Sequence, residues 1–157
     1  MKLIKNNLYI LCIIGLIILD QLLKIFIPKN IEVIHGILNF SYIENTGGAF
    51  GIMESNIFLM IIFNFIILFS IGKFMIRHKE RMSKLTKLGV IFLLGGGISN
   101  LIDRIFRGYV VDFIDFTPII NFPIFNFADI ILTIGWIFFI IGTANFMIKN
   151  KGEINAI

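Results

Sequence analysis

Long apolar runs separated by short polar segments dominate this sequence. Four runs are long enough to cross a lipid bilayer as helices, at about residues 8–27, 57–76, 85–102 and 128–148. Residues 31–53 are mixed in polarity, and large side chains recur at every second position from Leu38 to Tyr42, as in a strand. The pattern predicts an all-α integral membrane protein, one membrane domain over residues 1–157, with four transmembrane helices and a small β element on the outer membrane surface.

The composition also indicates a membrane protein. Hydrophobic residues make up 57% of the 157 positions, more apolar surface than a soluble domain of this length can bury. The formal net charge of +4 is carried by segments between the apolar runs, so it relates to membrane topology and not to a nucleic-acid partner. Cys12 is the single cysteine and the two histidines fall in different loops, so we expect neither a metal site nor a disulfide within the chain.

The first apolar run has two interpretations. Lys2 and Lys5 ahead of it are typical of a cleaved signal peptide, but residues 20–27 contain no small-x-small cleavage site, which favours a retained span. Within it, Asp20 and Lys24 are four residues apart and share a helix face. Either they form an ion pair turned into the helix bundle, or both lie at the interface with Lys24 extended toward water.

The distribution of Lys and Arg predicts the orientation. Ten of the fourteen lie at the N-terminus, in residues 73–87 or at the C-terminus. By the positive-inside rule, both termini and the loop over residues 77–84 are cytoplasmic. Residues 31–53 and the stretch from 103 to 129 then share the outer face.

Four of the ten acidic residues lie in that outer stretch: Asp103, Asp112, Asp115 and Asp129. Carboxylates between apolar runs are costly to place, so their presence indicates a function. Two carboxylates brought together can share a proton, which lets one act as general base on a water molecule while the other donates a proton. Spacing does not decide which pair meets, because Gly108, Pro118 and Pro123 argue against one continuous helix. The alternative is that these acids are interfacial ion-pair partners of Arg104 and Arg107.

Two pairs of an amide and a carboxylate spaced three residues apart favour a site, because on a helix both members face the same way. They are Asn100 with Asp103 and Asn126 with Asp129. Between the pairs, residues 110–116 can run extended, which turns Asp112 and Asp115 to opposite faces of a strand.

Glycines mark two further places. Gly47 and Gly48 form either a plain tight turn or a loop that closes on a ligand. Residues 95–97 are three glycines inside the third apolar run, where glycine lets helices approach closely in a bilayer.

Five motifs together resemble those of the bacterial lipoprotein signal peptidases, signal peptidase II. They follow one another along nearly the whole chain: Asp20-Gln-x-x-Lys24, Asn45-Thr-Gly-Gly-Ala-Phe-Gly51, Gly95-Gly-Gly-Ile-Ser-Asn100-Leu-Ile-Asp103-Arg104, Val110-Val-Asp112-Phe-Ile-Asp115 and Phe125-Asn126-Phe-Ala-Asp129. The resemblance implies an aspartic endopeptidase, without metal or cofactor, that cleaves diacylglyceryl-modified prolipoproteins just before the lipidated Cys. It also implies a multi-pass protein of the bacterial cytoplasmic (inner) membrane, with lipid as a partner and its active site at the outer face.

Residue roles follow from the matching motifs. The resemblance implies that Asp112 and Asp129 are the catalytic dyad. It implies substrate-binding or supporting roles for Asp20, Lys24, Asn45, Gly48, Gly96, Asn100, Asp103, Arg104, Asn126 and Ala128. The chain departs from the family pattern in having Gly48 where Ala is usual, and Gly97 and Ser99 where Ala and Gly are usual. These departures concern local packing and not the chemistry.

Two other classes of protein compete with a peptidase. In a small proton-coupled transporter or channel subunit, Asp20, Asp112 and Asp129 would form a proton relay, but only Asp20 falls inside a predicted span. A non-catalytic assembly subunit would have no need of Asp112 or Asp129. Substitution of these two residues therefore distinguishes an assembly subunit from an enzyme.

Overall fold

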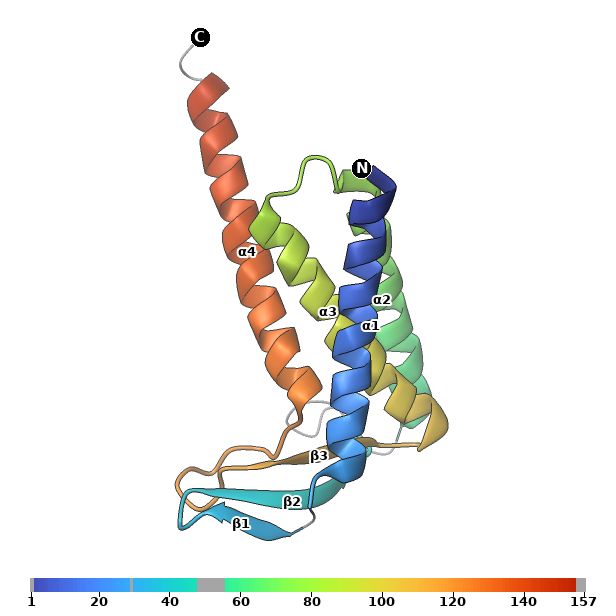
Figure 1. Cartoon of the computed structure of the whole chain (residues 1–157), viewed down its shortest axis with the longest axis vertical. Coiled ribbons are helices and arrows are strands. Elements are labelled where there is room, and N and C mark those ends of the chain that lie inside the picture. Colours follow the sequence, from blue (N-terminus) through green and yellow to red (C-terminus); the bar gives the residue numbers. More distant parts are fainter. Residues whose placement is uncertain (1, 29, 48–55, 155–157) are drawn as a thin grey trace.

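Four helices form a bundle, and a small sheet lies across one end of it (Figure 1). The computed structural model describes residues 2–28, 30–47 and 56–154, with side chains for residues 7–28, 30–47 and 56–148. The helices are α1 (Lys2–Phe26), α2 (Ile57–His78), α3 (Lys84–Phe106) and α4 (Phe127–Ile154). Each contains an apolar stretch long enough to cross a bilayer.

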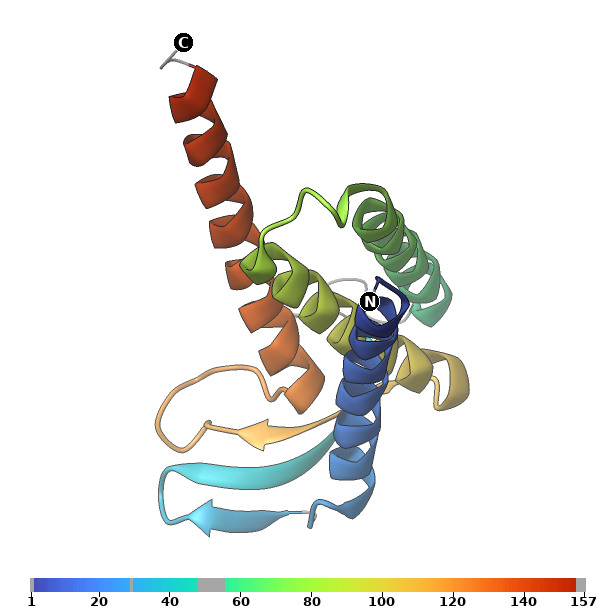
Figure 2. The same ribbon diagram turned by 45° about the horizontal axis from the view of Figure 1, so that its top comes forward.

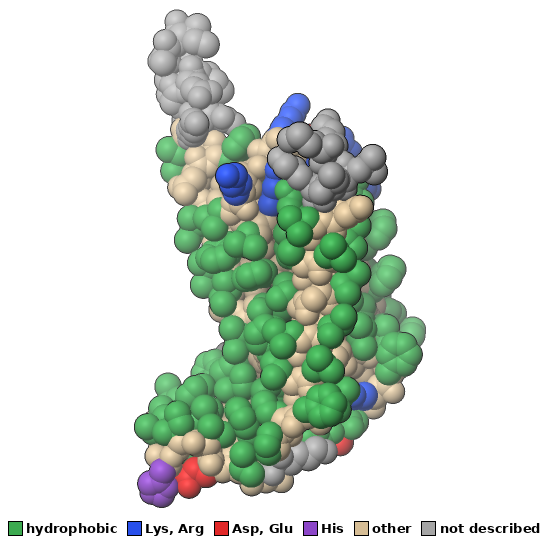
Figure 3. Space-filling model, viewed as in Figure 1, with side chains coloured by type: hydrophobic (Ala, Val, Ile, Leu, Met, Phe, Trp, Pro, Cys, Tyr) green, Lys and Arg blue, Asp and Glu red, His purple; other side chains and the backbone are tan. Residues whose placement is uncertain are grey.

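Helix α3 is the centre of the bundle, with α1, α2 and α4 packed around it (Figure 2). In its apolar stretch 61% of the residues are buried, compared with at most 17% in the other three helices. The outer surface of the bundle is correspondingly a broad apolar belt (Figure 3). The three surrounding helices therefore face lipid, and α3 is enclosed by protein.

The three consecutive glycines of α3 allow this central position. A Cβ atom at Gly95 would lie 3.0 Å from the Leu16 side chain of α1, and one at Gly97 would lie 2.5 Å from the Leu68 side chain of α2. At Gly96 it would lie 2.6 Å from the backbone oxygen of Ala128 in α4. Successive residues of a helix point about 100° apart, so the three glycines face three different neighbours.

The sheet contains β1 (Ile31–Ile34), β2 (Leu38–Asn45) and β3 (Val110–Asp115), antiparallel and in that spatial order. Strand β3 connects α3 to the segment before α4, and it pairs Asp112 with Ile43 of β2. Four apolar helices and a small antiparallel sheet confirm the predicted fold class. The part of the predicted β-rich segment from residue 48 to 53 lies outside the described residues.

Helix α3 continues to Phe106, beyond the predicted end of its span near residue 102. It can do so because Asp103 is paired: its carboxylate lies 2.8 Å from Lys24 and also binds Arg107, four residues further along the same helix. The charge distribution along the bundle is uneven. Lys and Arg side chains gather at the end that carries both termini, and acidic and histidine side chains appear at the sheet end (Figure 3).

Candidate active site

Asp112 and Asp129 line the same cavity, although they come from different elements. Asp112 lies in β3, and Asp129 lies in the first turn of α4. The cavity has a volume of about 990 Å³ and is bounded by the sheet, α3, α4 and residues 122–125. Asn45, Asn100 and Arg104 also line it, and most of the remaining wall is apolar. The fold thus places two carboxylates and three polar side chains in one largely apolar pocket.

Asn126 connects the two carboxylates. Its Nδ2 donates to Asp112 Oδ1 at 2.6 Å, and its Oδ1 accepts from the backbone N–H of Asp129 at 3.0 Å. Asp129 Oδ2 accepts in return from the backbone N–H of Asn126 at 3.1 Å. This reciprocal pattern is a capping box at the start of α4, in which the residue before the helix and the third helical residue satisfy each other's N–H groups. The local beginning of the helix therefore orients Asp129, and through Asn126 it also orients Asp112.

Asn100 holds Asp129 from the side of α3. Its Nδ2 donates to Asp129 Oδ1 at 2.9 Å, while its Oδ1 accepts from Lys24 Nζ at 2.9 Å. Only the oxygen of an amide can accept from an ammonium group, so Lys24 determines which way the Asn100 amide points. The amide hydrogens are thereby directed at the carboxylate of Asp129.

Asp112 is buried, with 2% of its surface exposed. Burial first, and then the nearby charge of Asp129, raise its pKa from the ordinary 3.8 to about 6. Hydrogen bonds from Asn126 and from Asn45 Nδ2, the latter at 2.8 Å to Oδ2, oppose this rise because they stabilise the ionised form. Asp112 can therefore gain or lose a proton close to neutral pH, as acid–base chemistry in water requires.

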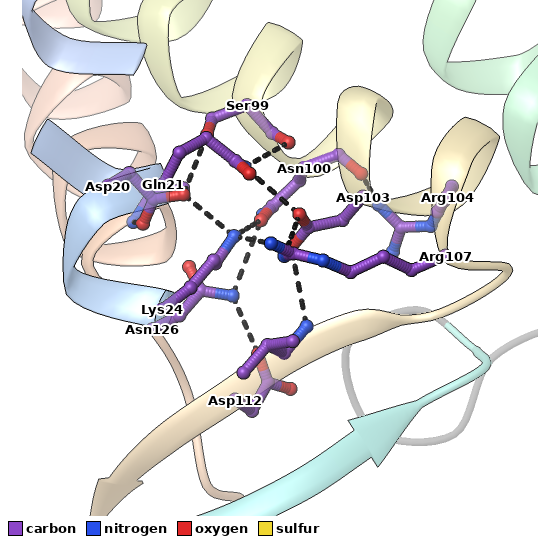
Figure 4. A network of polar contacts seen from close by, with 12 residues as sticks. Asp20, Gln21, Lys24, Ser99, Asn100, Asp103, Arg104, Arg107, Asp112 and Asn126 are labelled. Carbon is purple, nitrogen blue, oxygen red and sulfur yellow. Dashed lines mark hydrogen bonds and ion pairs between the residues drawn. The ribbon is translucent and has the colours of Figure 1, made fainter. Parts of the chain in front are cut away.

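A buried ion network lies next to this pair (Figure 4). Lys24 Nζ is 2.7 Å from Asp20 Oδ2 and 2.8 Å from Asp103 Oδ2, and all three side chains are fully buried. Of the two interpretations of Asp20 and Lys24, the structure has the ion pair within the bundle. Asp20 also accepts from the Ser99 hydroxyl at 2.7 Å and from the backbone N–H of Ala128 at 2.8 Å. Asp20 thus connects α1 to both α3 and α4.

The sequence pairs Asp103 with Asn100 by spacing and offers Arg104 as an ion-pair partner, but the carboxylate of Asp103 binds other residues in the structure. Its carboxylate binds Lys24 and Arg107 and accepts from the backbone N–H of Val111 at 3.3 Å. The ion-pair interpretation is therefore correct for this acid and Arg107. Asp103 ties α1, α3 and the start of β3 together, and it does not line the cavity.

Arg104 lies between the cavity and the segment after β2. Its Nη2 donates to the backbone oxygen of Gly47 at 3.0 Å, and Nη1 donates to the backbone oxygen of Asn100 at 3.3 Å. Its Nε is buried and has no acceptor in the part of the chain that the structure describes. Gly48, predicted to support the site, lies outside the described residues.

Asp115 belongs to a separate group of contacts. It accepts from the Ser41 hydroxyl at 2.6 Å and from the backbone N–H and hydroxyl of Thr117 at 2.8 and 2.6 Å. These hydrogen bonds stabilise the ionised carboxylate and so lower its pKa, and the bond from Ser41 has the largest effect. Asp115 therefore joins β2 to the segment that follows β3, apart from the carboxylates of the cavity.

Two network residues were given no role by the sequence analysis: Gln21 and Ser99. Gln21 Nε2 donates to Ser99 Oγ at 3.0 Å and to Asp103 Oδ1 at 2.9 Å. Gln21 follows Asp20 inside an apolar run, and a polar residue at such a position usually faces the bundle interior. That signal was available for Gln21, whereas the contacts of Ser99 with Asp20 and Gln21 depend on how α3 is rotated against α1.

Comparison with known proteins gives consistent matches. Residues 12–145 match the model of the family described as Signal peptidase (SPase) II. A relative named "Lipoprotein signal peptidase" from Clostridioides difficile (strain 630) is 35% identical over 150 residues, covering 92% of this chain and 99% of the relative. A second relative of the same name, from Clostridium novyi (strain NT), is 36% identical over 136 residues, which cover 82% of this chain and 91% of the relative.

Solved structures agree with these matches. One titled "Bacterial membrane enzyme structure by the in meso method at 2.3 A resolution" superposes with a TM-score of 0.79 at 35% identity, covering 88% of each chain. A second, with the same title at 1.9 Å, has a TM-score of 0.74 at 36% identity and covers 86% of this chain and 91% of the other.

Proposed function

Because the chain belongs to the signal peptidase II family of multi-pass membrane proteases, which remove signal peptides from lipoprotein precursors, we propose that Asp112 and Asp129 are its catalytic pair. The observation that carries the proposal is the link through Asn126. One amide side chain bridges two carboxylates that line one cavity.

The proposed reaction is hydrolysis of a peptide bond by activated water. The ionised carboxylate of the pair removes a proton from a water molecule, and the oxygen of that water adds to the carbonyl carbon of the substrate. The protonated carboxylate hydrogen-bonds the carbonyl oxygen as negative charge develops on it. A proton then passes to the amide nitrogen and the C–N bond breaks, which yields a carboxylic acid and a free amine. Asp112, with a pKa raised to about 6, can exchange a proton close to neutral pH. The mechanism requires no metal and no organic cofactor.

The proposed substrate is a diacylglyceryl-modified prolipoprotein, cut just before its lipidated Cys. A substrate held in the bilayer by its signal peptide and its acyl chains arrives with the scissile bond at a restricted depth, which removes part of the orientational search. The cavity, which has both polar and apolar lining residues, suits a substrate that has a peptide backbone and acyl chains. Ile130, Ile134 and Trp136 of α4 form part of the apolar wall of the cavity.

The surrounding polar residues position the pair in this proposal. Asn45 and Asn126 hold Asp112, and Asn100 holds Asp129. Arg104 lines the cavity, and its guanidinium donates to the backbone oxygens of Gly47 and Asn100, which holds the segment after β2 against α3. Asp20, Lys24 and Asp103 connect α1 to α3, and Asp20 also connects α1 to the start of α4.

For the orientation, we propose that both termini are cytoplasmic and that the sheet faces outward across the bacterial cytoplasmic membrane. The six cationic residues between positions 73 and 87 support it. In a Cys12→Ser background, Arg81→Cys and His35→Cys can be labelled in intact cells with an impermeant maleimide. We expect labelling at position 35 and none at 81, and the reverse result would refute the orientation.

Single-turnover cleavage of a purified diacylated prolipoprotein tests the catalytic assignment. Asp112→Asn and Asp129→Asn should each reduce the cleavage rate by at least about a thousandfold, because each removes a group that transfers a proton. Asp115→Asn is the matched control, because Asp115 lies in β3 like Asp112 but binds Ser41 and Thr117. Its rate should stay within about tenfold of wild type. A folded Asp112→Asn or Asp129→Asn enzyme with full activity would exclude the proposed pair.

A further inference from the structure

Residues 116–125, between β3 and the start of α4, form a loop whose two ends are fastened together. The backbone oxygen of Phe125 accepts from the N–H groups of Phe113 and Ile114 at 3.0 and 2.8 Å, and its N–H donates to the oxygen of Ile114 at 3.2 Å. The rings of Phe116 and Phe125 stack with centroids 6.2 Å apart. The base of this 116–125 loop is therefore held against the sheet.

The loop is also ordered internally. Thr117 binds Asp115 through both its N–H and its hydroxyl. The N–H groups of Ile119 and Ile120 both donate to the oxygen of Phe116 at 3.0 Å, and Phe122 N–H donates to the oxygen of Ile120 at 2.8 Å. A closed loop of about ten residues that satisfies its own backbone holds its side chains in set directions.

The tip of this ordered loop is apolar and exposed. Ile119, Ile120 and Phe122 leave 60%, 57% and 45% of their surfaces uncovered. No charged residue occurs from Phe116 to Ala128. Loops that face water usually expose polar side chains, and large apolar side chains gathered at one exposed place mark a contact surface. Because the base is fastened, these three side chains cannot turn inward to escape water.

The position of the loop identifies what covers the tip. The loop ends at Phe125, two residues before α4 begins, and it lies on the side of the sheet that faces the helices (Figures 1 and 2). The apolar surface of the bundle continues onto this side (Figure 3). By contrast, the hairpin of β1 and β2 carries Glu32 in β1 and His35 in its turn, and the His35 side chain is 97% exposed. The sheet and the 116–125 loop thus have a polar edge directed away from the helix bundle and an apolar edge next to the bundle.

We propose that Ile119, Ile120 and Phe122 insert into the hydrocarbon edge of the outer leaflet, with the acyl chains of membrane lipid as their partner. Removing apolar side chains from water is favourable, so lipid that covers the tip stabilises the loop in this position. Residues 122–125 meanwhile line the cavity of Asp112 and Asp129. The loop therefore separates that cavity from the lipid and fixes the depth of its opening. The membrane contact itself is independent of the proposed catalytic pair.

Site-directed fluorescence can test the inference without any measurement of activity. In a Cys12→Ser background, an environment-sensitive nitrobenzoxadiazole label is attached to Ile120→Cys, and separately to Ile119→Cys. Each protein is reconstituted in phosphatidylcholine vesicles with and without lipid spin-labelled near the top of the acyl chain. The matched control is His35→Cys, an exposed position in the turn between β1 and β2.

We expect the labels at 119 and 120 to emit at shorter wavelength than the label at 35. Spin-labelled lipid should quench them at least about threefold more, and aqueous iodide should quench them less. Iodide quenching at 119 and 120 equal to that at 35 would overturn the inference, since the tip would then be in water. Shielding from both iodide and spin-labelled lipid would overturn it too, because the tip would then pack against protein, such as a second copy of this chain.

Discussion

The carboxylate of Asp20 accepts a hydrogen bond from the backbone N–H of Ala128 at 2.8 Å, although the two residues are 108 positions apart. Ala128 lies in the first turn of α4, where backbone N–H groups have no partner within the helix. A buried acid of α1 therefore satisfies the start of α4 directly before Asp129. The same carboxylate pairs with Lys24, so the position of Asp129 depends on a charge network outside the cavity.

Removing Lys24 should destabilise the protein strongly. Lys24→Met leaves Asp20 and Asp103 buried without their shared cation, and loss of one partner from a buried ion pair costs about 3–5 kcal/mol. Thermal unfolding in detergent should show a large decrease in Tm, and replacing both acids by Asn in the same variant should restore most of it without restoring cleavage. Lys73→Met, at an exposed lysine of α2, is the control and should leave Tm unchanged. An unchanged Tm in Lys24→Met would contradict this account.

Asn45 should tune the pH dependence of cleavage. Its Nδ2 stabilises ionised Asp112, and it opposes the burial and the charge of Asp129 that raise the pKa of that carboxyl to about 6. Without the hydrogen bond the carboxyl keeps its proton to higher pH, so in Asn45→Ala the limb of the kcat/KM profile that reports the titration of Asp112 should move to higher pH. Asn39→Ala, in the same strand but away from the cavity, should keep the wild-type profile. If both profiles coincide with wild type, Asn45 has no such role.

Asp112 should also make stability decrease with rising pH. Its pKa lies above the ordinary 3.8, so the folded state holds this proton more tightly than the unfolded state. The associated stabilisation is complete below about pH 4 and is lost as pH rises through about 6. Relative to Asp112→Asn, which cannot titrate, wild type should lose up to about 3 kcal/mol over that window. The measurement is Tm of both proteins between pH 4.5 and 7.5, and parallel curves would show that the folded and unfolded pKa values are equal.

Gly96 should be intolerant of a side chain. An added Cβ would lie 2.6 Å from the backbone oxygen of Ala128, so α3 and α4 would have to separate next to Asp129. Gly96→Ala should therefore lower both Tm and the cleavage rate. Gly15→Ala is the matched control within a helix, because nothing lies within 4 Å of its added Cβ, and alanine is the better helix former. Equal behaviour of the two variants would show that the close approach at Gly96 has no energetic consequence.

The sequence alone indicated the membrane class, the four helices, the strand character of residues 38–43 and an extended segment over residues 110–116. These follow from apolar periodicity and length, which are local properties of the chain. The capping box of Asn126 and Asp129 is local as well, because its hydrogen bonds are made within four residues. The motifs that resemble signal peptidase II also identified the family, since they depend on residue order and not on geometry.

Only the tertiary structure decided which acids meet. Spacing left several pairings of the four outer aspartates open, and the register of β3 and the rotation of α4 select Asp112 and Asp129. The same holds for Lys24, which finds Asp103 at a distance of 79 positions only once α1 packs on α3. Side-chain partners far apart in the chain depend on how the helices are rotated and how closely they approach. Packing across the whole bundle sets those two quantities, and no single segment of the sequence encodes them.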